Sequence, residues 1–450
     1  MTTTEDIYKL FLQHPRISTD TRKILPGSLF FALKGEKFDA NTFAQQAIEA
    51  GAAYAIIDNP AIKIDRRYLL VDNVLTALQD LARHHRRQLN IPVIGLTGTN
   101  GKTTTKELIN SVLSQHYKTQ ATQGNLNNHI GVPLTVLTVG KTHQIAVIEM
   151  GANHQKEIEL LCTIAQPTHG LITNVGKAHL EGFGGVEGVK KGKGELYDFL
   201  KESESQEARG VAFVNSDDAV LLEMEQQRGL QHTVFYGTGN ADNLVTGQLI
   251  ENSPLLALEW ENNNSGQIYQ VKTQLTGAYN LDNILAAMCI GVYFGLSDDE
   301  INKGVESYQP KNNRSQIVQT ATNTLICDYY NANPSSMFVA IENIGKINAN
   351  RKVLILGDMF EMGEESAVEH KGVIKKAMET SVEERIFIGE DFFKAGSTMD
   401  DRPWTMDKKP TFYETAEDAI EGLKANPVKN STILIKGSRG MALERLVELF

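Results

Sequence analysis

The sequence predicts an α/β protein with several domains that are built on largely parallel sheets. Its 450 residues correspond to two to four domains at about 100 to 200 residues per domain. Apolar runs of strand length alternate with helix-length segments, which is typical of a parallel, doubly wound sheet. One such run, at residues 91–97, leads into a glycine-containing loop and then into an amphipathic helix.

The composition is that of a folded protein with no bulk attraction to anions. Apolar residues make up 41% and charged residues 22%, which excludes disordered and fibrous classes. Lys and Arg total 44 against 55 Asp and Glu, giving a formal charge of −11. This balance predicts no nucleic-acid partner, so an anionic substrate must be held by a local site.

The cysteines and the N-terminus indicate a cytoplasmic protein. The three cysteines, Cys162, Cys289 and Cys327, show neither paired nor metal-type spacing, so we expect reduced thiols that pack as small apolar residues. The N-terminus has no basic stretch followed by a long apolar run, and no apolar stretch reaches about 18 residues. We therefore predict neither secretion nor membrane insertion.

The first domain is predicted to span residues 1–90 as a small α/β unit. It combines strand-like and helix-like runs and ends in a segment with Val74, Leu75, Leu78 and Leu81 on one helical face. Before that helix come strands at 29–33 and 54–58 and a helical pattern at 44–52.

The central domain is predicted at residues 91–312. Further strands are expected at 145–150 and 170–175, hairpin-like excursions at 260–274, and an apolar helix at 281–295. The polar residues 311–314 suggest the next boundary. The remaining segment, 313–450, repeats the strand pattern at 324–330, 352–359, 385–390 and 431–438, which predicts a second, smaller α/β domain.

The strongest local signal is a phosphate-binding loop at a strand-to-helix turn. Glycines let the backbone wrap a phosphate chain, a lysine neutralises β/γ oxygens, and a threonine hydroxyl can bind Mg²⁺. The candidate residues are Gly98, Thr99, Asn100, Gly101, Lys102, Thr103 and Thr104. The sequence has Leu96 where the full pattern has glycine, so a chance Gly-Lys-Thr turn is the alternative.

Three later features are weaker when each is taken by itself. Glu149 ends an apolar strand, where a Mg²⁺ ligand belongs in a parallel sheet, although a lone acidic residue there is usually solvated. His179 follows another strand and is either a metal ligand or a capped loop histidine. Lys190, Lys191 and Lys193 form a basic, glycine-broken stretch that is either a solvated face or a phosphate or metal contact.

Taken together, the motifs resemble the Mur ligase family, whose ATP-dependent members build the cytoplasmic peptidoglycan precursor. The resemblance covers essentially the whole chain. The motifs match in family order: TGTNGKT at 97–103, EMGAN at 149–153, AHLEGFG at 178–184, KGKGE at 191–195, GAYNLDN at 277–283, Arg314 and KGSR at 436–439.

Within the family, four segments resemble the member that joins D-alanyl-D-alanine to UDP-N-acetylmuramoyl-tripeptide. They are TQGNLNN at 122–128, YNANP at 330–334, LGDMFEMG at 356–363, and Asp20-Thr21-Arg22 with the following PGSLFFALKGEKFD. These segments imply substrate contacts at Asp20, Thr21, Arg22, Asn125, Asn127, Asn128, Asn331 and Asn333. The KGSR segment, with Lys436, Ser438 and Arg439, is by resemblance a candidate contact to the incoming dipeptide or the transferring phosphoryl group.

The resemblance implies a UDP-substrate domain, a central P-loop-like ATPase domain and a C-terminal Rossmann-like domain. It also implies a two-step reaction. The terminal tripeptide carboxylate attacks the γ-phosphate of ATP to form an acyl phosphate, and the dipeptide amine then attacks that carbonyl. The enzyme is expected to be a monomer whose main task is to position and neutralise charge.

The resemblance also implies roles for single residues. Lys102 and Thr103 would hold phosphates and one Mg²⁺, and Glu149 and His179 a second Mg²⁺. Lys193 matches a lysine that becomes carbamylated, which converts a cation into an anion that can orient metal. Nucleotide contacts are implied for Asn280, Asn283, Arg314 and Asp328.

Two departures from the family pattern concern the nucleotide and the lysine. Tyr279 stands where many members have histidine, which affects one nucleotide contact. Gly192 replaces the more usual alanine, which suggests a more flexible lysine loop. The alternatives are a folate-type glutamate ligase, against which YNANP and GNLNN argue, and a P-loop protein without ligase activity.

Overall fold

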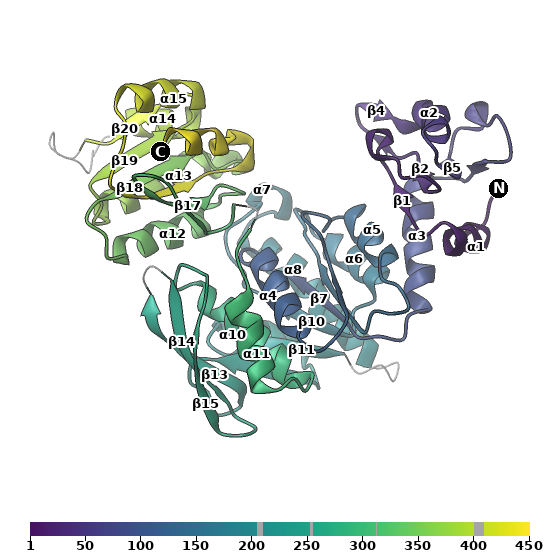
Figure 1. The fold of residues 1–450 in the computed structure, drawn as a ribbon, viewed down its shortest axis with the longest axis horizontal. Coiled ribbons are helices and arrows are strands. Elements are labelled where there is room, and N and C mark those ends of the chain that lie inside the picture. The colour runs from purple at the N-terminus through teal and green to yellow at the C-terminus, as the bar shows by residue number, and fades with distance from the viewer. Residues whose placement is uncertain (205–209, 253–254, 312, 400–408) are drawn as a thin grey trace.

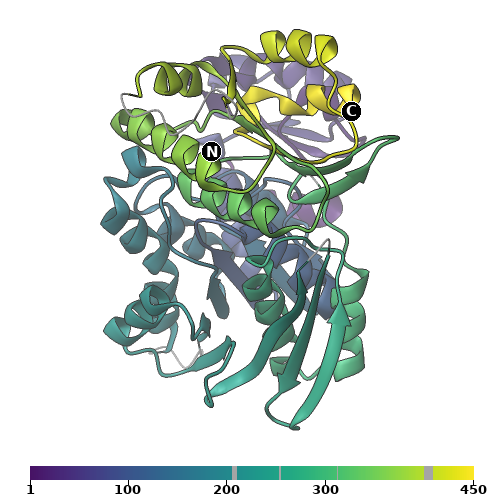
Figure 2. The same cartoon turned by 90° about the vertical axis from the view of Figure 1, so that its left-hand side faces the viewer.

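The described residues form three large sheets of four, nine and six strands that follow one another along the sequence, and one two-stranded hairpin. The computed structural model describes residues 1–204, 210–252, 255–311, 313–399 and 409–450. Figure 1 shows the parts with the first and third sheets at opposite ends of the molecule, joined through the part with the nine-stranded sheet. The predicted α/β class is confirmed, and Figure 2 shows the same arrangement from the side.

The N-terminal part is a four-stranded parallel sheet in the order β1-β2-β5-β6. Its strands are β1 (Ile17–Ser18), β2 (Leu29–Phe31), β5 (Tyr54–Ile57) and β6 (Tyr68–Leu70), with a small hairpin of β3 (Lys34–Gly35) and β4 (Phe38–Asp39). The helices are α1 (Thr4–Gln13), α2 (Ala44–Glu49) and α3 (Val74–Arg87). The strands and helices predicted here from periodicity are therefore present.

Helix α3 connects the N-terminal sheet to the nine-stranded sheet through a shared core. Its buried residues Leu78 and Leu81 belong to one apolar cluster that includes Phe31 of the first sheet and Val132 of helix α5 (Gly131–Leu137). Arg86 near its end is buried, and its guanidinium donates to the carbonyl oxygens of Ala165, Leu89 and Gln166. The two parts are thus packed together, and not merely tethered by a linker.

The nine-stranded sheet has the order β15-β14-β13-β12-β11-β10-β7-β9-β8. Its strands are parallel from β8 to β13, and β14 and β15 add an antiparallel hairpin that confirms the excursion expected at 260–274. The strands are β7 (Val93–Thr97), β8 (Thr119–Ala121), β9 (Ile145–Glu149), β10 (His169–Ile172), β11 (Val211–Asn215), β12 (Thr233–Gly237), β13 (Asn243–Asn252), β14 (Leu256–Asn262) and β15 (Gln267–Lys272).

Helices cover both faces of this sheet because successive strand side chains point to opposite sides. Ile94 and Leu96 of β7 join one buried cluster, and Val93 joins the other. Residues of α4 (Lys102–Leu113), α10 (Asn280–Tyr293) and α11 (Asp298–Ser307) contribute to the first cluster. Residues of α5 (Gly131–Leu137), α6 (Glu157–Ala165) and α8 (Val186–Glu204) contribute to the second. The part also contains α7 (Leu180–Phe183) and α9 (Ala219–Arg228).

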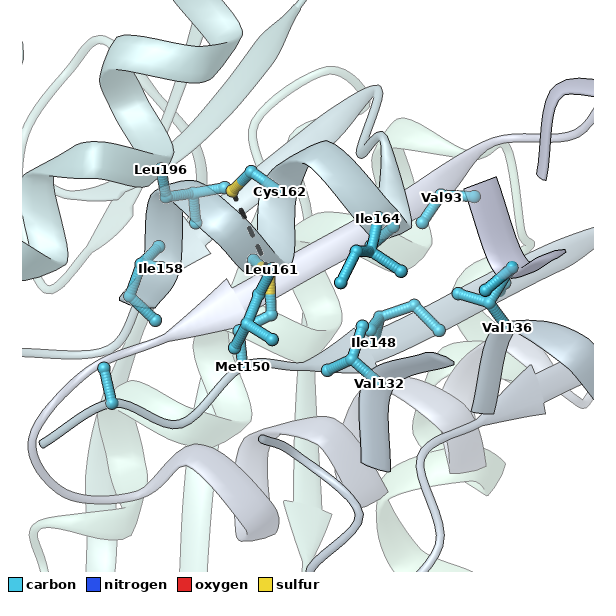
Figure 3. Packing of buried hydrophobic residues seen from close by; sticks show 14 of the residues in the cluster. Val93, Val132, Val136, Ile148, Met150, Ile158, Leu161, Cys162, Ile164 and Leu196 are labelled. Carbon is cyan, nitrogen blue, oxygen red and sulfur yellow. Dashed lines mark hydrogen bonds between the residues drawn. The ribbon is translucent and has the colours of Figure 1, made fainter. Parts of the chain in front are cut away.

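The second cluster also shows how the cysteines are used. Figure 3 shows Cys162 packed among apolar side chains, with its Sγ 3.9 Å from Sδ of Met150. Cys289 and Cys327 are likewise buried, and all three thiols are free. The prediction that they pack as small apolar residues is confirmed.

The C-terminal sheet has the order β16-β17-β21-β18-β19-β20 and is parallel except for β16. The four strands predicted from apolar runs are all present, and the boundary expected at residue 312 lies outside the described residues. The strands are β16 (Gln316–Gln319), β17 (Thr324–Asp328), β18 (Lys352–Gly357), β19 (Glu384–Ile388), β20 (Thr411–Tyr413) and β21 (Thr432–Lys436); the helices are α12 (Pro334–Lys346), α13 (Ser366–Glu379), α14 (Glu390–Ser397) and α15 (Ala416–Ala425).

One expectation about local structure is wrong. The lysine stretch at 190–193 is not a flexible loop but part of the continuous helix α8. A Cβ atom at Gly192 would lie 2.5 Å from the ring of Phe183, so the glycine makes room for that ring and does not loosen the helix. Among the described residues, no helix has the length and apolarity needed to cross a bilayer.

Candidate active site

The loop between β7 and α4 depends on two glycines with positive φ. Gly98 has φ +146° and Gly101 has φ +79°, values that favour glycine. A Cβ at Gly98 would lie 2.0 Å from Oγ1 of Thr173, and one at Gly101 would lie 2.6 Å from Oδ1 of Asn283. Both positions therefore require glycine for conformation and for space.

Leu96 explains why the phosphate-loop pattern is incomplete. Its side chain is fully buried within β7, opposite Glu149 of β9 in the strand register. The strand thus continues through the position at which the full pattern has its first glycine, and the turn begins only at Gly98. The loop is shorter than the pattern requires but leads into the helix in the same way.

Lys102 lies at the start of helix α4 with its ammonium group turned back onto the loop. Nζ donates to the carbonyl oxygens of Gly98 at 2.6 Å and Thr99 at 2.9 Å. Burial lowers the lysine pKa to about 8, which nearby Arg314 also favours and Glu149 opposes. The phosphate of a nucleotide would supply an anion beside this partly buried cation.

Thr103 and Glu149 form a compact oxygen pair at the ends of neighbouring elements. The Thr103 hydroxyl donates to Glu149 Oε2 at 3.0 Å, and Asn127 Nδ2 donates to Oε1 at 2.9 Å. Glu149 is almost completely buried. Hydroxyl and carboxylate oxygens are the hard ligands that Mg²⁺ prefers, so this pair fits the predicted metal.

His179 faces the C-terminal part of the molecule. It has a positive φ of 50°, and its Nδ1 contacts a carboxylate oxygen of Glu361. Burial lowers the pKa of the imidazole, and Glu361 opposes that shift. In the described ranges, no group of three or more His, Cys, Asp or Glu side chains is placed to hold a metal.

Lys193 is buried inside helix α8. Its Nζ lies 3.3 Å from the carbonyl oxygen of Ala152 and 5.1 Å from the centre of the Phe183 ring. Burial, together with the positive charge of Lys102, holds the pKa of this lysine well below its usual value. Both causes shift this lysine toward its neutral form.

The start of helix α10 approaches the loop from the other side. Asn283 Oδ1 accepts from Thr105 Oγ1 at 2.9 Å, and its Nδ2 donates to Asn280 Oδ1 at 2.8 Å. The hydroxyl groups of Tyr279 and Ser315 share a hydrogen bond of 2.5 Å between their oxygen atoms. Burial raises the pKa of the Tyr279 hydroxyl. Tyr279 thus ties the helix to the segment that enters the C-terminal sheet.

Charged residues from the C-terminal sheet complete the site. The Arg314 guanidinium lies 3.7 Å from the centre of the Tyr330 ring, and its Nε is buried without a hydrogen-bond partner among the described residues. Asp328 accepts from Ser315 N at 3.1 Å and from Lys436 Nζ at 2.7 Å. An unpaired guanidinium nitrogen in a cleft is suited to an anionic ligand.

These elements surround one cavity of about 860 Å³ between the central and C-terminal sheets. It is lined by Thr99, Asn100, Gly101, Lys102, Thr103, Thr104, Asn125, Asn127, Asn128, Glu149, His179, Asn280, Asn283, Arg314, Asp328, Asn331, Asn333 and Lys436, among others. A smaller cavity of about 210 Å³ beside it is lined by His179, Asn331, Asn333, Glu361, Ser438 and Arg439, among others. The larger volume is within the range of small-molecule and cofactor sites.

Comparison with known proteins agrees with this geometry. The sequence matches the Mur ligase middle domain over residues 96–291, the Mur ligase glutamate ligase domain over 313–439, and the Mur ligase family catalytic domain over 15–86. It is 35% identical over 445 residues to the UDP-N-acetylmuramoyl-tripeptide–D-alanyl-D-alanine ligase of Bacillus subtilis, covering 96% of this chain and 92% of that protein. The chain belongs to the Mur ligase family.

Solved structures of Mur ligases share the whole fold. A crystal structure of MurF from Acinetobacter baumannii superposes with a TM-score of 0.84 at 32% identity, covering 96% of this chain and 92% of that one. MurF from Thermotoga maritima in complex with ADP has a TM-score of 0.81 at 26% identity, covering 98% and 97%. Folylpolyglutamate synthase from Mycobacterium tuberculosis shares only the fold, with a TM-score of 0.61 at 16% identity.

This Mur ligase brings most, but not all, of the predicted site residues together. Gly98 and Lys193 are not among the residues that line the cavity. Asp20, Thr21 and Arg22 lie in the N-terminal part, where Asp20 caps a short helical turn and pairs with Arg22 at 2.8 Å. Ser438 and Arg439 line only the smaller cavity.

The sequence reasoning did not assign several residues of the Mur ligase site. Asn174 accepts from Asn100 N at 3.0 Å, and Ser335 accepts from Asn100 Nδ2 at 3.1 Å. Tyr330 and Glu361 lie in recognised motifs but had no role. The sequence carries no local signal for these contacts, since each partner comes from a distant segment.

Proposed function

We propose that this Mur ligase joins D-alanyl-D-alanine to UDP-N-acetylmuramoyl-tripeptide and releases ADP and phosphate. The product is the UDP-N-acetylmuramoyl-pentapeptide precursor of peptidoglycan. The observation that carries the proposal is that Lys102, the Thr103–Glu149 pair and Arg314 all line the larger cavity. In this arrangement, the groups proposed to bind the ATP phosphates and those proposed to contact the substrates face the same cavity.

The reaction requires an activated carboxylate, because a free carboxylate would have to expel oxide. The terminal tripeptide carboxylate attacks the γ-phosphorus, the bond to ADP breaks, and an acyl phosphate forms. The dipeptide amine then attacks the acyl carbon, the nitrogen loses a proton, and phosphate leaves. Most of the catalysis is therefore positioning and charge neutralisation.

Lys102 and Arg314 supply the fixed positive charge for this chemistry. Both belong to the cavity wall, one from the central sheet and one from the segment entering the C-terminal sheet. Asn280, Asn283 and Asp328 are the proposed partners of the adenosine part of ATP. Because these groups come from two sheets, they converge only when the central and C-terminal parts pack together.

The Thr103–Glu149 pair is the proposed Mg²⁺ site, and its oxygen atoms fit that ion. Bound Mg²⁺ would neutralise charge on the phosphates. A second Mg²⁺ near Glu149 and His179 remains a prediction from the family resemblance. Its ligand set would need an additional anion, which a carbamate on Lys193 could provide.

Carbamylation of Lys193 is favoured by its surroundings. The reaction joins the amine nitrogen to the carbon of carbon dioxide and releases a proton, so it requires a neutral amine. Burial lowers the pKa of Lys193 and so shifts the side chain toward that form. The carbamate would carry a negative charge toward the neighbouring Lys102.

We assign a role to each of the three domains from its position relative to the larger cavity. Residues 1–90, with Asp20, Thr21 and Arg22, would bind the UDP part, and residues 91–312 would bind ATP. Residues 313–450, with Asn331, Lys436, Ser438 and Arg439, would close the site on the dipeptide side. Asn125 and Asn128 lie on the tripeptide side, and we propose a cytoplasmic monomer.

The test is whether ADP release depends on both acceptor and dipeptide. Purified protein is given ATP and Mg²⁺ with UDP-N-acetylmuramoyl-tripeptide, with D-alanyl-D-alanine, or with both. We expect ADP and pentapeptide only with both substrates. Equal ATP turnover with either one omitted would contradict a ligase and favour a nucleotide-binding protein of another kind.

A side-by-side assay identifies the accepted tripeptide. Tripeptides ending in meso-diaminopimelate and in lysine are compared at equal concentration, with the same dipeptide. A folate–glutamate pair serves as the control for the alternative ligase class. Turnover of that pair in place of the UDP-linked substrates would overturn the proposed substrate class.

A further inference from the structure

The phosphate-binding loop is held from the C-terminal part of the molecule through the side chain of Asn100. Its Oδ1 accepts from Asn333 Nδ2 at 2.9 Å, and its Nδ2 donates to Ser335 Oγ at 3.1 Å. The oxygen and the nitrogen of the Asn100 amide therefore both bond residues that are 233 and 235 positions away in the sequence. Asn100 lies directly between Thr99 and the positive-φ Gly101.

The same loop residue is fixed through its backbone by the central sheet. Asn100 N donates to Asn174 Oδ1 at 3.0 Å, and its carbonyl oxygen accepts from Thr173 Oγ1 at 2.6 Å. The backbone is thus held from within the central part. Among the described residues, the hydrogen bonds of the side chain go only to Asn333 and Ser335 of the C-terminal part. Separation of the two parts would release the side chain alone.

The partner residues are themselves pre-organised at the first turn of helix α12. Asn333 is mostly buried and caps the helix, with Oδ1 accepting from Ser336 N at 2.9 Å and Ser335 Oγ at 3.0 Å. Capping uses the oxygen of the Asn333 amide and leaves its nitrogen free to donate to Asn100. One side chain therefore both starts the helix and contacts the loop.

There is little space for an alternative arrangement at this junction. Gly176 follows β10, and a Cβ placed there would lie 3.2 Å from Ser335 Oγ. Gly176 N in turn donates to Thr99 Oγ1 at 2.9 Å. The loop, the segment after β10 and the first turn of α12 form one closely packed contact.

We infer that Asn333, supported by Ser335, is a positioning residue that orders the phosphate-binding loop through Asn100. This role makes nucleotide binding depend on the docking of the C-terminal part. It replaces the direct substrate contact that the sequence resemblance implied for Asn333. The inference deepens the proposed function and rests on it for the catalytic readout, but ADP binding can be measured without any ligase reaction.

The test separates capping from loop positioning by the choice of substitution. Asn333→Ser keeps a good N-cap but is too short to donate to Asn100. Asn100→Ala removes the other partner, and the double variant closes a double-mutant cycle. Each protein is titrated with ADP in a calorimeter, and KM for ATP and for D-alanyl-D-alanine is measured together with kcat.

We expect Asn333→Ser to weaken ADP binding and raise KM for ATP by about tenfold, the factor expected for one hydrogen bond of this kind. Asn100→Ala also removes the bond to Ser335 and should weaken ADP binding at least as much. The double variant should bind ADP no more weakly than Asn100→Ala alone, because Asn100→Ala already removes the contact to Asn333. KM for D-alanyl-D-alanine should change less than twofold. Unchanged ADP affinity in Asn333→Ser, or multiplicative losses in the double variant, would overturn the inference.

A second variant covers the case in which Asn333→Ser does not fold. Ser335→Ala leaves the Asn333 cap in place and removes the acceptor of Asn100 Nδ2. We expect the same selective loss of ADP affinity, and an unchanged affinity would again overturn the inference. A rise confined to KM for D-alanyl-D-alanine would instead identify a direct substrate contact. Failure of wild-type protein to form pentapeptide would reject the proposed function while the ADP titrations still decide this inference.

Discussion

The hydroxyl of Thr103 donates a hydrogen bond of 3.0 Å to Glu149, although 46 residues separate the two positions in the sequence. They meet because β7 and β9 are parallel neighbours with Leu96 opposite Glu149, so the helix after β7 starts beside the end of β9. Carboxyl ends of parallel strands form the binding edge of such sheets. This pair is therefore a direct consequence of strand order.

Loss of charge at Glu149 should stop the ligase reaction without unfolding the protein. Glu149→Gln keeps an oxygen for the Thr103 hydroxyl but removes the anion that we assign to Mg²⁺. We expect ADP release to fall at least about 100-fold, as for other removed electrostatic groups. Thr103→Ser is the matched control because it retains the hydroxyl, and it should remain close to wild type. Full activity of Glu149→Gln would contradict the metal assignment.

Replacement of Lys193 should be reversible by a small acid. Lys193→Ala removes the proposed carbamate, and activity should return in part when a short carboxylic acid is added, because its carboxylate can occupy the vacated space. Lys190→Ala is the control on the same helix, since Lys190 forms an ion pair with Glu223 at the surface. The measurement is ADP release against acid concentration. Full activity of Lys193→Ala without added acid would reject the carbamate.

His169 should make the stability of the protein depend on pH. Burial lowers its pKa to about 4, and its ring packs near Phe213, Tyr293 and Phe294. Since the unfolded chain has a pKa near 6.5, protonation favours unfolding, and stability that is present above pH 6.5 is lost as the pH falls. The loss between pH 7 and 5 should be about 2 kcal/mol.

Denaturant unfolding of His169→Gln at both pH values measures this contribution. The variant should be less stable at pH 7, because ring packing is lost, but should have a smaller pH slope than wild type. His154→Gln, which changes an exposed histidine in the central part, is the control. An identical slope in wild type and His169→Gln would show that His169 does not cause the pH dependence.

The C-terminal part should close further on the nucleotide. Lys177 and Glu369 form an ion pair at 2.9 Å across the junction, and the cavity is lined from both sides. We expect the radius of gyration measured by small-angle scattering to decrease when ATP and both substrates are added. Lys102→Ala should show a smaller decrease with the same ligands. Superimposable wild-type profiles with and without ligands would argue against closure.

The sequence by itself determined the local features of this protein. Apolar runs predicted β7, β9, β17, β18, β19 and β21, because buried parallel strands need continuous apolar side chains. The glycine-containing turn before Lys102 could also be predicted from the local sequence, because its backbone conformation requires glycine. Glu149 could be placed beside Thr103 because strand ends in a parallel sheet share one edge.

Only the tertiary structure decided how distant groups pair. It placed Lys193 inside a helix beneath Phe183, directed His179 toward Glu361, and joined Asn100 to Asn333. None of these contacts follows a repeating sequence pattern. The first depends on how two helices of the central part pack, and the other two depend on how the central and C-terminal parts meet. Periodicity reports the backbone state of a segment, whereas the partner of a polar side chain is set by long-range packing.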